Sequence, residues 1–250
     1  VLILEQGPAI TDPIASHARN QPRFQADPDS YLETAIQQLA FFDENAPRDE
    51  LPGAAVTRVQ GGQGVIWTNL CPRGDAPWAA LSAAEWDQYY SMAETYLAVQ
   101  DDWFDGSTRQ HKIGEALHPA MASEGRQIET LPVAATPDEN GHLYFTAPHD
   151  ILAASSEAGM RVRIASGTVD SLLHEGKRVT GVKVGDETIT AKEVIIAAGA
   201  IGTPQLLHRS GIRPKALGRW LSYHPILICQ IVLKEDLCVA PGETDREPRL

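Results

Sequence analysis

The stretch EVIIAAGAIGTPQLLHRSGI, residues 193–212, decides the fold class of this chain. Residues 194–197 are an uninterrupted apolar run, which is typical of a buried strand in a parallel sheet. Thr203 can cap a helix, Pro204 suits its first position, and Gly211 suits its end. A strand, a turn of small residues and a helix in direct succession predict an α/β fold.

The turn inside this stretch is a candidate nucleotide site. Residues 197–202 read AAGAIG, so five of the six are Ala or Gly. Ligands of open α/β sheets bind at the carboxyl ends of the strands, where Ala198 and Gly199 would leave room for them. Close packing of a helix on a strand would also explain such small residues.

The residues before this stretch have an alternating pattern. Four short segments with period two follow one another, separated by Gly-containing turn signals, at residues 161–165, 168–174, 178–184 and 187–190. This pattern predicts a run of short strands, most simply a β-meander.

The chain opens with VLILEQG, a short apolar run that ends at Glu5. In dinucleotide-binding folds the second strand ends in an acidic residue that hydrogen-bonds the ribose hydroxyls. We therefore expect residues 1–4 to form a central parallel strand and Glu5 to face a ribose. The glycine-rich turn of such a fold would precede Val1. Apolar strands ending in Glu are also common outside nucleotide sites.

A second glycine-rich segment, GGQGVIWTN, occupies residues 61–69. Gly61 and Gly62 allow the backbone to approach a flat or anionic ligand closely. A tight surface turn is the alternative, because no phosphate-binding Lys follows the glycines. A large aromatic residue and two small polar residues come directly after the turn, which favours a ligand site.

Residues 82–100 carry the clearest helical pattern. Ser82 and Glu85 have the spacing of a capping box, in which two free amides at a helix start are satisfied. An apolar stripe then recurs at helical spacing, and we expect it to lie in the core. Its members are Trp86, Tyr89, Tyr90, Ala93, Tyr96 and Leu97.

The remaining segments suggest how the chain is organised. Residues 9–57 contain several prolines and little periodicity, which predicts a long excursion over the surface with one helix at 31–42. We expect one mixed domain over residues 1–222. Residues 223–250 are expected to be the start of a second domain.

The composition limits the classes of partner. The chain has 250 residues, 33 acidic against 21 basic, and a net charge of -12, which argues against broad binding of nucleic acid or anionic lipid. No apolar run approaches the ~20 residues of a membrane span. The opening residues VLILEQGP have no basic lead-in and no cleavage site, so we do not expect them to be a signal peptide. Cys71, Cys229 and Cys238 have no metal-like spacing. They are expected to fill the core of a cytoplasmic protein.

Together these segments resemble the glucose–methanol–choline (GMC) oxidoreductases. Residues 193–212, followed by LGRWLSYHP at 217–225, are similar to the second FAD-binding signature of that family. The resemblance implies a Rossmann-like FAD-binding domain with a β-meander, followed by an antiparallel-sheet substrate domain. The residues that it implies near FAD are Glu5, Gly61, Gly62, Thr68, Asn69, Val169, Ala198, Gly199 and His224. Without the resemblance, a lone His before Pro, as at His224, is more often structural.

Within the family, residues 56–73 and 85–104 resemble the pyranose 2-oxidase and bacterial C-glycoside 3-oxidase branch. Pyranose oxidases link FAD covalently through a His immediately before a Trp-Thr pair, and this chain has Ile66 there. The resemblance therefore implies non-covalent FAD and oxidation of a secondary hydroxyl of a sugar or C-glycoside. It also places Thr68 near flavin N5, the atom that accepts the hydride.

The family keeps its catalytic base, a His with a His or Asn partner, far toward the C-terminus. We therefore assign no catalytic residue within residues 1–250, and expect this chain alone to be inactive. Two alternatives stay open: a GMC enzyme for a non-sugar alcohol, and an inactive nucleotide-binding fragment or subunit. The electron acceptor and a homo-oligomeric state also stay open.

Overall fold

The first strand of the chain pairs in parallel with a strand far along the sequence. The computed structural model describes residues 1–27, 56–74, 81–103, 107–138, 142–221 and 234. In it, β1 (Leu2–Glu5) lies beside β5 (Arg163–Ser166), in a register that runs from Leu2↔Arg163 to Glu5↔Ser166. The parallel pairing expected of β1 is confirmed. The central position expected of it is not observed, because among the described residues β5 is its only strand partner and all residues of β1 are partly exposed.

The antiparallel meander is confirmed for three strands. β6 (Ser171–Glu175), β7 (Arg178–Val184) and β8 (Glu187–Thr190) form one sheet in sequence order. Glycines with left-handed backbone form its two turns, Gly176 with φ 60° and Gly185 with φ 57°. The expectation that residues 161–165 belong to this meander is wrong, because β5 pairs with β1 instead. Alternation predicts a strand, but it does not identify the partner.

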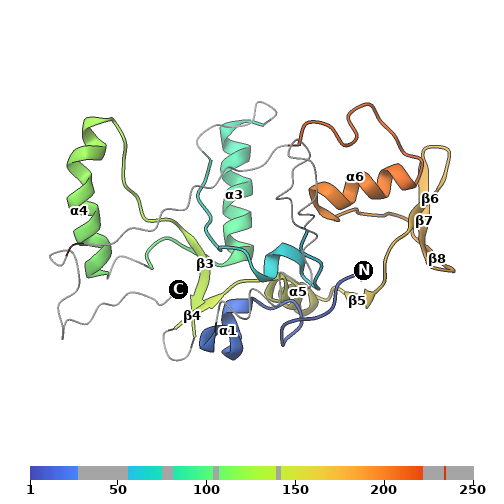
Figure 1. Cartoon of the computed structure of the whole chain (residues 1–250), viewed down its shortest axis with the longest axis horizontal. Helices are drawn as coiled ribbons and strands as arrows, with labels where there is room; N and C mark the ends of the chain where they lie inside the picture. The colour runs from blue at the N-terminus through green and yellow to red at the C-terminus, as the bar shows by residue number, and fades with distance from the viewer. Residues whose placement is uncertain (28–55, 75–80, 104–106, 139–141, 222–233, 235–250) are drawn as a thin grey trace, which may run out of the picture.

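Helix α6 (Gly199–Arg209) packs against this sheet, and Figure 1 shows it beside β6 and β7. Leu206 packs against Leu172 and Val182 in one apolar cluster. The helix ends as expected, because Gly211 follows it with φ 77° and donates a backbone hydrogen bond to His208.

The start of α6 differs from expectation. Its N-cap is Ala198, so Thr203 is not the cap and Pro204 lies inside the helix. The Ala- and Gly-rich turn itself adopts helical geometry, which lengthens the helix by more than one turn toward the N-terminus. Residues 194–197 are not a strand in the described structure, and the side chain of Ile195 is 90% exposed. An apolar run becomes a strand only where a ladder partner is present.

A second antiparallel sheet has a buried core of its own. It consists of β2 (Val99–Gln100), β3 (Val133–Pro137) and β4 (Leu143–Phe145). Helix α4 (Thr108–Ser123) precedes β3, and α5 (Pro148–Glu157) follows β4. The buried residues of this sheet's core are Val133, Ala135, Leu143 and Phe145, with Trp103 packed against them.

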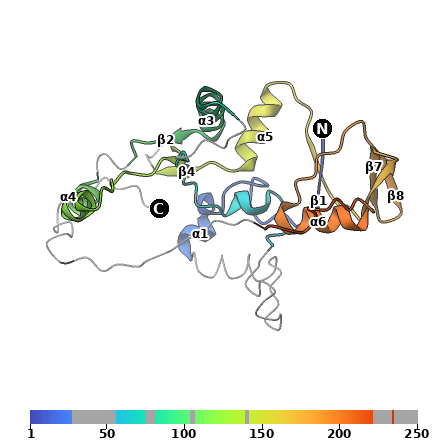
Figure 2. The ribbon, with the colours of Figure 1, turned by 90° about the horizontal axis from the view of Figure 1, so that it is seen from above.

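Helix α3 (Ala83–Leu97) begins with the expected capping box. Ser82 Oγ accepts a hydrogen bond from the backbone of Glu85, and the Glu85 carboxylate accepts one from the backbone of Ser82. The expectation that its apolar stripe is core is wrong for the described structure. The helix has no buried residue, and Tyr89 and Tyr96 are 50% and 65% exposed. Helical periodicity identifies an apolar face, but not what covers it. Figure 2 shows α3 on the periphery.

Part of the expected surface excursion is buried. Residues 15–18 are at most 2% exposed, and they lead into η1 (Ala18–Asn20), which α1 (Pro22–Ala26) follows. Because residues 15–18 are only four in number and mostly small, they have no periodic pattern from which their burial could be predicted. The helix predicted at 31–42 lies outside the described residues. So does all of the expected second domain except residue 234.

No helix within the described ranges is long and apolar enough to cross a membrane.

We expect Gly7→Ala to destabilise the protein strongly. A Cβ on Gly7 would lie 2.2 Å from the backbone carbonyl oxygen of Arg58, so one of the two backbones would have to move. Overpacking of this kind costs about 1–3 kcal/mol or more. Urea denaturation of the complete protein measures the change.

The matched control is Gly176→Ala. The Cβ position of Gly176 has open space around it, so only the left-handed backbone conformation disfavours a side chain there. Its cost should be about 1 kcal/mol. Equal losses for both variants would contradict the role of the close contact at Gly7.

Candidate functional site

The carboxyl ends of β1 and β5 form one side of the candidate site. Glu5 lies opposite Ser166 in the ladder, and the backbone N–H of Gly167 donates to the Glu5 carbonyl at 2.9 Å. The carboxylate of Glu5 accepts a hydrogen bond from Gly7 N at 3.0 Å, which leaves acceptor capacity on its oxygens. Glu5 is therefore an acceptor at the sheet edge where nucleotides bind in open α/β folds.

The glycine-rich loop is attached to this sheet edge. Gln60 N donates to the Pro8 carbonyl at 3.0 Å, and the Gln60 side-chain amide reaches Ser166 Oγ at 3.5 Å. The close approach of Gly7 to Arg58 supports the same junction. The structure thus brings together Glu5 and the loop, two sites that the sequence predicted separately.

Two glycines of the loop have different surroundings. Gly61, with φ 96°, leaves no room for a side chain, because a Cβ would lie 2.6 Å from Val65 Cγ1 and 2.9 Å from Ala15 Cβ. Gly62 begins η2 (Gly62–Val65) with φ 54°, and its Cβ position has no atom within 4 Å. Gly61 therefore packs the loop onto the protein, and Gly62 faces open space that a flat ligand can approach.

The segment after the loop alternates between buried and exposed residues. Trp67 Nε1 donates to the Thr146 carbonyl at 3.0 Å. The Asn69 amide donates to the carbonyls of Thr146 and Ala134, each at 2.9 Å, and Asn69 is completely buried. Thr68 between them is exposed and has no hydrogen bond to the described residues. Its N–H and hydroxyl are therefore free to bind a ligand.

Asn69 carries a buried acceptor without a partner. Its Oδ1 makes no hydrogen bond within the described residues, although both amide protons are satisfied. Buried polar groups are normally paired, so this oxygen suits a ligand donor or an ordered water molecule.

Ile66 packs inward. Its side chain contacts the cluster formed by Ala15, Val59 and Val65, and it also contacts Ala18. It has no group that could form a covalent bond to a flavin.

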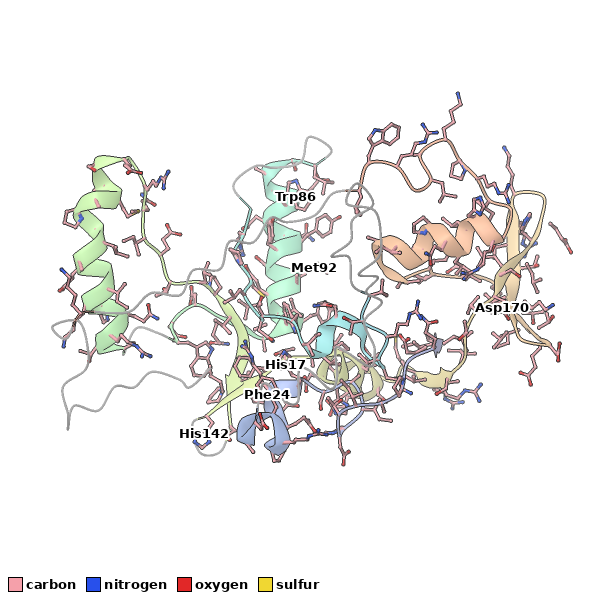
Figure 3. All side chains as sticks on the ribbon, in the orientation of Figure 1. His17, Phe24, Trp86, Met92, His142 and Asp170 are labelled. Carbon is pink, nitrogen blue, oxygen red and sulfur yellow. The ribbon has the colours of Figure 1, made fainter. Side chains whose placement is uncertain are left out.

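Sequence reasoning did not identify His17, the largest polar residue buried at this site. His17, which is labelled in Figure 3, is 1% exposed. Its ring lies 5.4 Å from that of Phe145. Nδ1 accepts from Arg19 N at 3.1 Å, so the proton is on Nε2, which donates to the Trp67 carbonyl at 3.0 Å. Burial lowers the pKa of His17 to about 4, and the nearby positive charge of Arg19 adds to this. A single His in an aperiodic segment gave no signal.

The other predicted residues lie around α6. Val169 packs against the same apolar cluster as Leu4 and Ile196, which places β1 and the segment before α6 in one unit. Ala198 is the N-cap of α6. Gly199 is the first residue of the helix and has a φ of 74°. No hydrogen bond among the described residues links either of them to the glycine loop. His224 lies outside the described residues.

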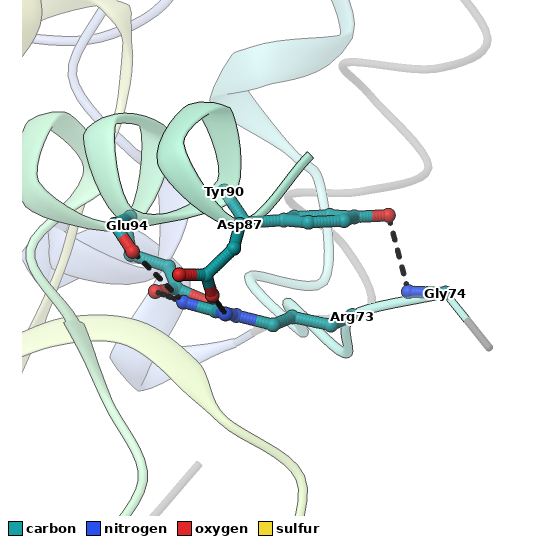
Figure 4. A network of polar contacts seen from close by, with 6 residues as sticks. Arg73, Gly74, Asp87, Tyr90 and Glu94 are labelled. Atoms are coloured by element: carbon teal, nitrogen blue, oxygen red, sulfur yellow. Dashed lines mark hydrogen bonds and ion pairs between the residues drawn. The ribbon is translucent and has the colours of Figure 1, made fainter. Parts of the chain in front are cut away.

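The chain beyond Asn69 is fixed to α3 by Arg73, as Figure 4 shows. Its guanidinium donates to both carboxylate oxygens of Glu94 and to one of Asp87, each at 2.6 Å. Tyr90 OH accepts from Gly74 N at 3.1 Å. Hydrogen bonding from Arg73 lowers the pKa of Glu94. This exposed cluster orients the segment that leaves the site. Among the described residues no group of His, Cys, Asp and Glu suits a metal ion.

Comparison with known families explains this arrangement. The model of the GMC oxidoreductase family matches residues 61–226, more than half of the chain. The chain belongs to the GMC oxidoreductases. Membership confirms the α/β fold class and the FAD cofactor expected from the sequence. The matched region begins at Gly61, the first glycine of the loop.

The chain is similar to curated enzymes of three kinds. A pyranose 2-oxidase from Tricholoma matsutake is 28% identical, over 95% of this chain and 50% of that protein. A C-glycoside 3-oxidase from Microbacterium trichothecenolyticum is 26% identical, over 94% of this chain and 53% of that protein. An oxygen-dependent choline dehydrogenase from Pseudomonas putida is 38% identical over 63% of this chain and 34% of that protein. The chain thus spans about half the length of the first two.

A solved structure of an FAD-dependent oxidoreductase from Chaetomium thermophilum superposes on the chain with a TM-score of 0.49. It is 18% identical and covers 87% of this chain and 44% of that one.

We expect the protein to become less stable in mild acid, because His17 is neutral in the folded state and is protonated when the chain unfolds. The folded pKa of about 4 lies below the ordinary value of 6.5, so unfolding takes up a proton between these pH values. The stability is complete above pH 6.5 and is lost as the pH falls toward 4, by at most roughly 3 kcal/mol.

Urea denaturation of the complete protein between these pH values measures this loss. Carboxylates also titrate there, so His17→Gln, which cannot take up a proton, is the control. The variant should lose less stability than the wild type over the same pH interval. Parallel curves would contradict a buried neutral imidazole.

Proposed function

We propose that the complete protein is an FAD-dependent oxidoreductase that oxidises a secondary hydroxyl of a sugar or C-glycoside. The observation that carries this proposal is the glycine loop held at the carboxyl end of β1 beside Glu5, which is followed along the chain by the exposed Thr68 with its free donors. The pyranose 2-oxidase and C-glycoside 3-oxidase relatives match nearly the whole chain and support the sugar substrate.

The residues present fit FAD in charge and in space. The Glu5 carboxylate can accept hydrogen bonds from ribose hydroxyls. The open side of Gly62 leaves room for a flat ring, and the buried Asn69 Oδ1 awaits a donor. Val169 and the uncapped start of α6 at Ala198 and Gly199 lie in the unit that contains β1. These positions and His224 are proposed as cofactor-binding residues.

When bound, FAD supplies the acceptor for the hydride of the alcohol. The chain's own residues would bind and orient the ring system. The Thr68 N–H and hydroxyl can donate hydrogen bonds to electron-rich acceptor atoms. His17 cannot act as the base that removes the hydroxyl proton, because it is buried and both ring nitrogens are occupied. We therefore assign no catalytic base within this chain.

The complete protein, purified with FAD, provides the test. Under anaerobic conditions, addition of a pyranose or a C-glycoside should bleach the visible flavin absorbance within one turnover. A deoxy analogue that lacks the reacting hydroxyl is the matched control, and it should leave the spectrum unchanged. Absence of flavin from the purified protein would contradict the proposal.

A second candidate substrate is a non-sugar alcohol such as choline. The observation that favours it is the choline dehydrogenase relative, which has a higher identity of 38% over a shorter part of the chain. Choline belongs in the same anaerobic assay. Bleaching by choline, with none by any sugar or glycoside, would replace the sugar proposal by this one.

We also expect the flavin to be bound without a covalent link. Ile66 occupies the position of the linking His and packs into the apolar cluster around Val65. Acid precipitation of the complete protein should therefore leave the yellow colour in the supernatant. Free FAD carried through the same procedure is the control. Colour that stays with washed, precipitated protein would contradict this expectation.

A further inference from the structure

The hydrogen bond from His17 to the Trp67 carbonyl determines how the next peptide group is presented. The peptide between Trp67 and Thr68 is trans, since the cis peptide among the described residues is Asp12-Pro13. In a trans peptide the C=O and the N–H point in opposite directions. A carbonyl drawn toward the buried imidazole therefore turns the Thr68 N–H away from the interior.

We propose that His17 is a positioning residue, which aims the Thr68 N–H at the flavin. This inference rests on the proposed function. Thr68 is exposed, and its N–H has no partner among the described residues, so the orientation creates an unused donor on the open side of the segment. Flavin N5 and the neighbouring C4 carbonyl are acceptors that such donors fit.

The other anchors of the segment do not control this peptide. Trp67 is held through its indole, which donates to the Thr146 carbonyl. Asn69 is held through its side chain and through its own carbonyl, which accepts from Ala134 N at 2.8 Å. Loss of His17 would therefore leave both ends of the segment attached and release the carbonyl between them.

His17 is itself rigidly held. Arg19 N donates to its Nδ1, and the ring packs on Phe145 at 5.4 Å with planes tilted by 34°. Asn20 fixes the same segment to Phe145, since its amide donates to the Phe145 carbonyl at 2.8 Å and its Oδ1 accepts from Phe145 N at 2.9 Å. A neutral imidazole in this setting donates to Trp67 throughout the physiological pH range, in agreement with its lowered pKa.

The test uses three variants of the complete protein with FAD. His17→Phe keeps an aromatic ring against Phe145 but removes the donor. His17→Gln loses the ring but can still donate to the Trp67 carbonyl. Phe145→Leu damages the packing around His17 and leaves its donor in place.

We expect His17→Phe to raise the FAD dissociation constant about tenfold, the effect of one lost hydrogen bond to a charged or polarised group. It should also shift the flavin absorbance spectrum and change the flavin midpoint potential, because protein groups that hydrogen-bond the ring tune its electronics. His17→Gln should restore the spectrum and potential. Phe145→Leu should lose stability and keep both. A crystal structure of His17→Phe should show the Trp67 carbonyl turned from its wild-type direction.

Several results would overturn the proposal. A wild-type spectrum and potential in His17→Phe, with only a loss of stability, would make His17 merely structural. An equal shift in Phe145→Leu would lead to the same conclusion, as would an unmoved Trp67 carbonyl in the crystal structure. A wild-type protein without flavin would overturn the proposed function and, with it, the role of His17 toward the cofactor. This outcome is distinguishable from failure of the His17 proposal alone, because it is seen in the wild type before any variant is made.

Discussion

Gly7 lies so close to Arg58 that a Cβ there would be 2.2 Å from the Arg58 carbonyl oxygen. This contact joins the end of β1 to the start of the glycine loop, which are separated by more than fifty residues in the sequence. The contact therefore keeps the end of β1, which carries Glu5, against the segment that leads into the loop. The parallel pairing of β1 with β5 then adds Ser166, which Gln60 contacts from the loop.

Features that depend on near neighbours in the sequence were predictable. The capping box at Ser82 needs only Glu85 three residues later, and the turn at Gly176 needs only a residue that tolerates positive φ. The segments around Glu5 and Gly61 were also recognised as distinct, because glycine and an acidic strand end have specific uses in nucleotide sites. Family membership confirms the FAD cofactor, and the roles of these two segments in binding it stay predictions.

Features that depend on distant partners were not predictable from patterns. The period-two segment that contains β5 pairs with β1, about 160 residues away, and nothing in its alternation specifies that partner. The apolar stripe of α3 has the period of a core helix, yet its face at Tyr96 is exposed. His17 lies in a segment without periodicity, and its role depends on Trp67 and Phe145, which its own neighbours do not specify.

The three residues Trp67, Thr68 and Asn69 show why both kinds of information are needed. Their chemistry is visible in the sequence: an indole donor, a small hydroxyl and a carboxamide. Asn69 has φ 61°, a left-handed conformation that Asn adopts more readily than most residues, and its amide satisfies two buried carbonyls. With both flanking side chains committed to the interior, Thr68 is the residue left for a ligand. Which way its N–H points is decided by a histidine fifty positions earlier, through a single bond to the Trp67 carbonyl.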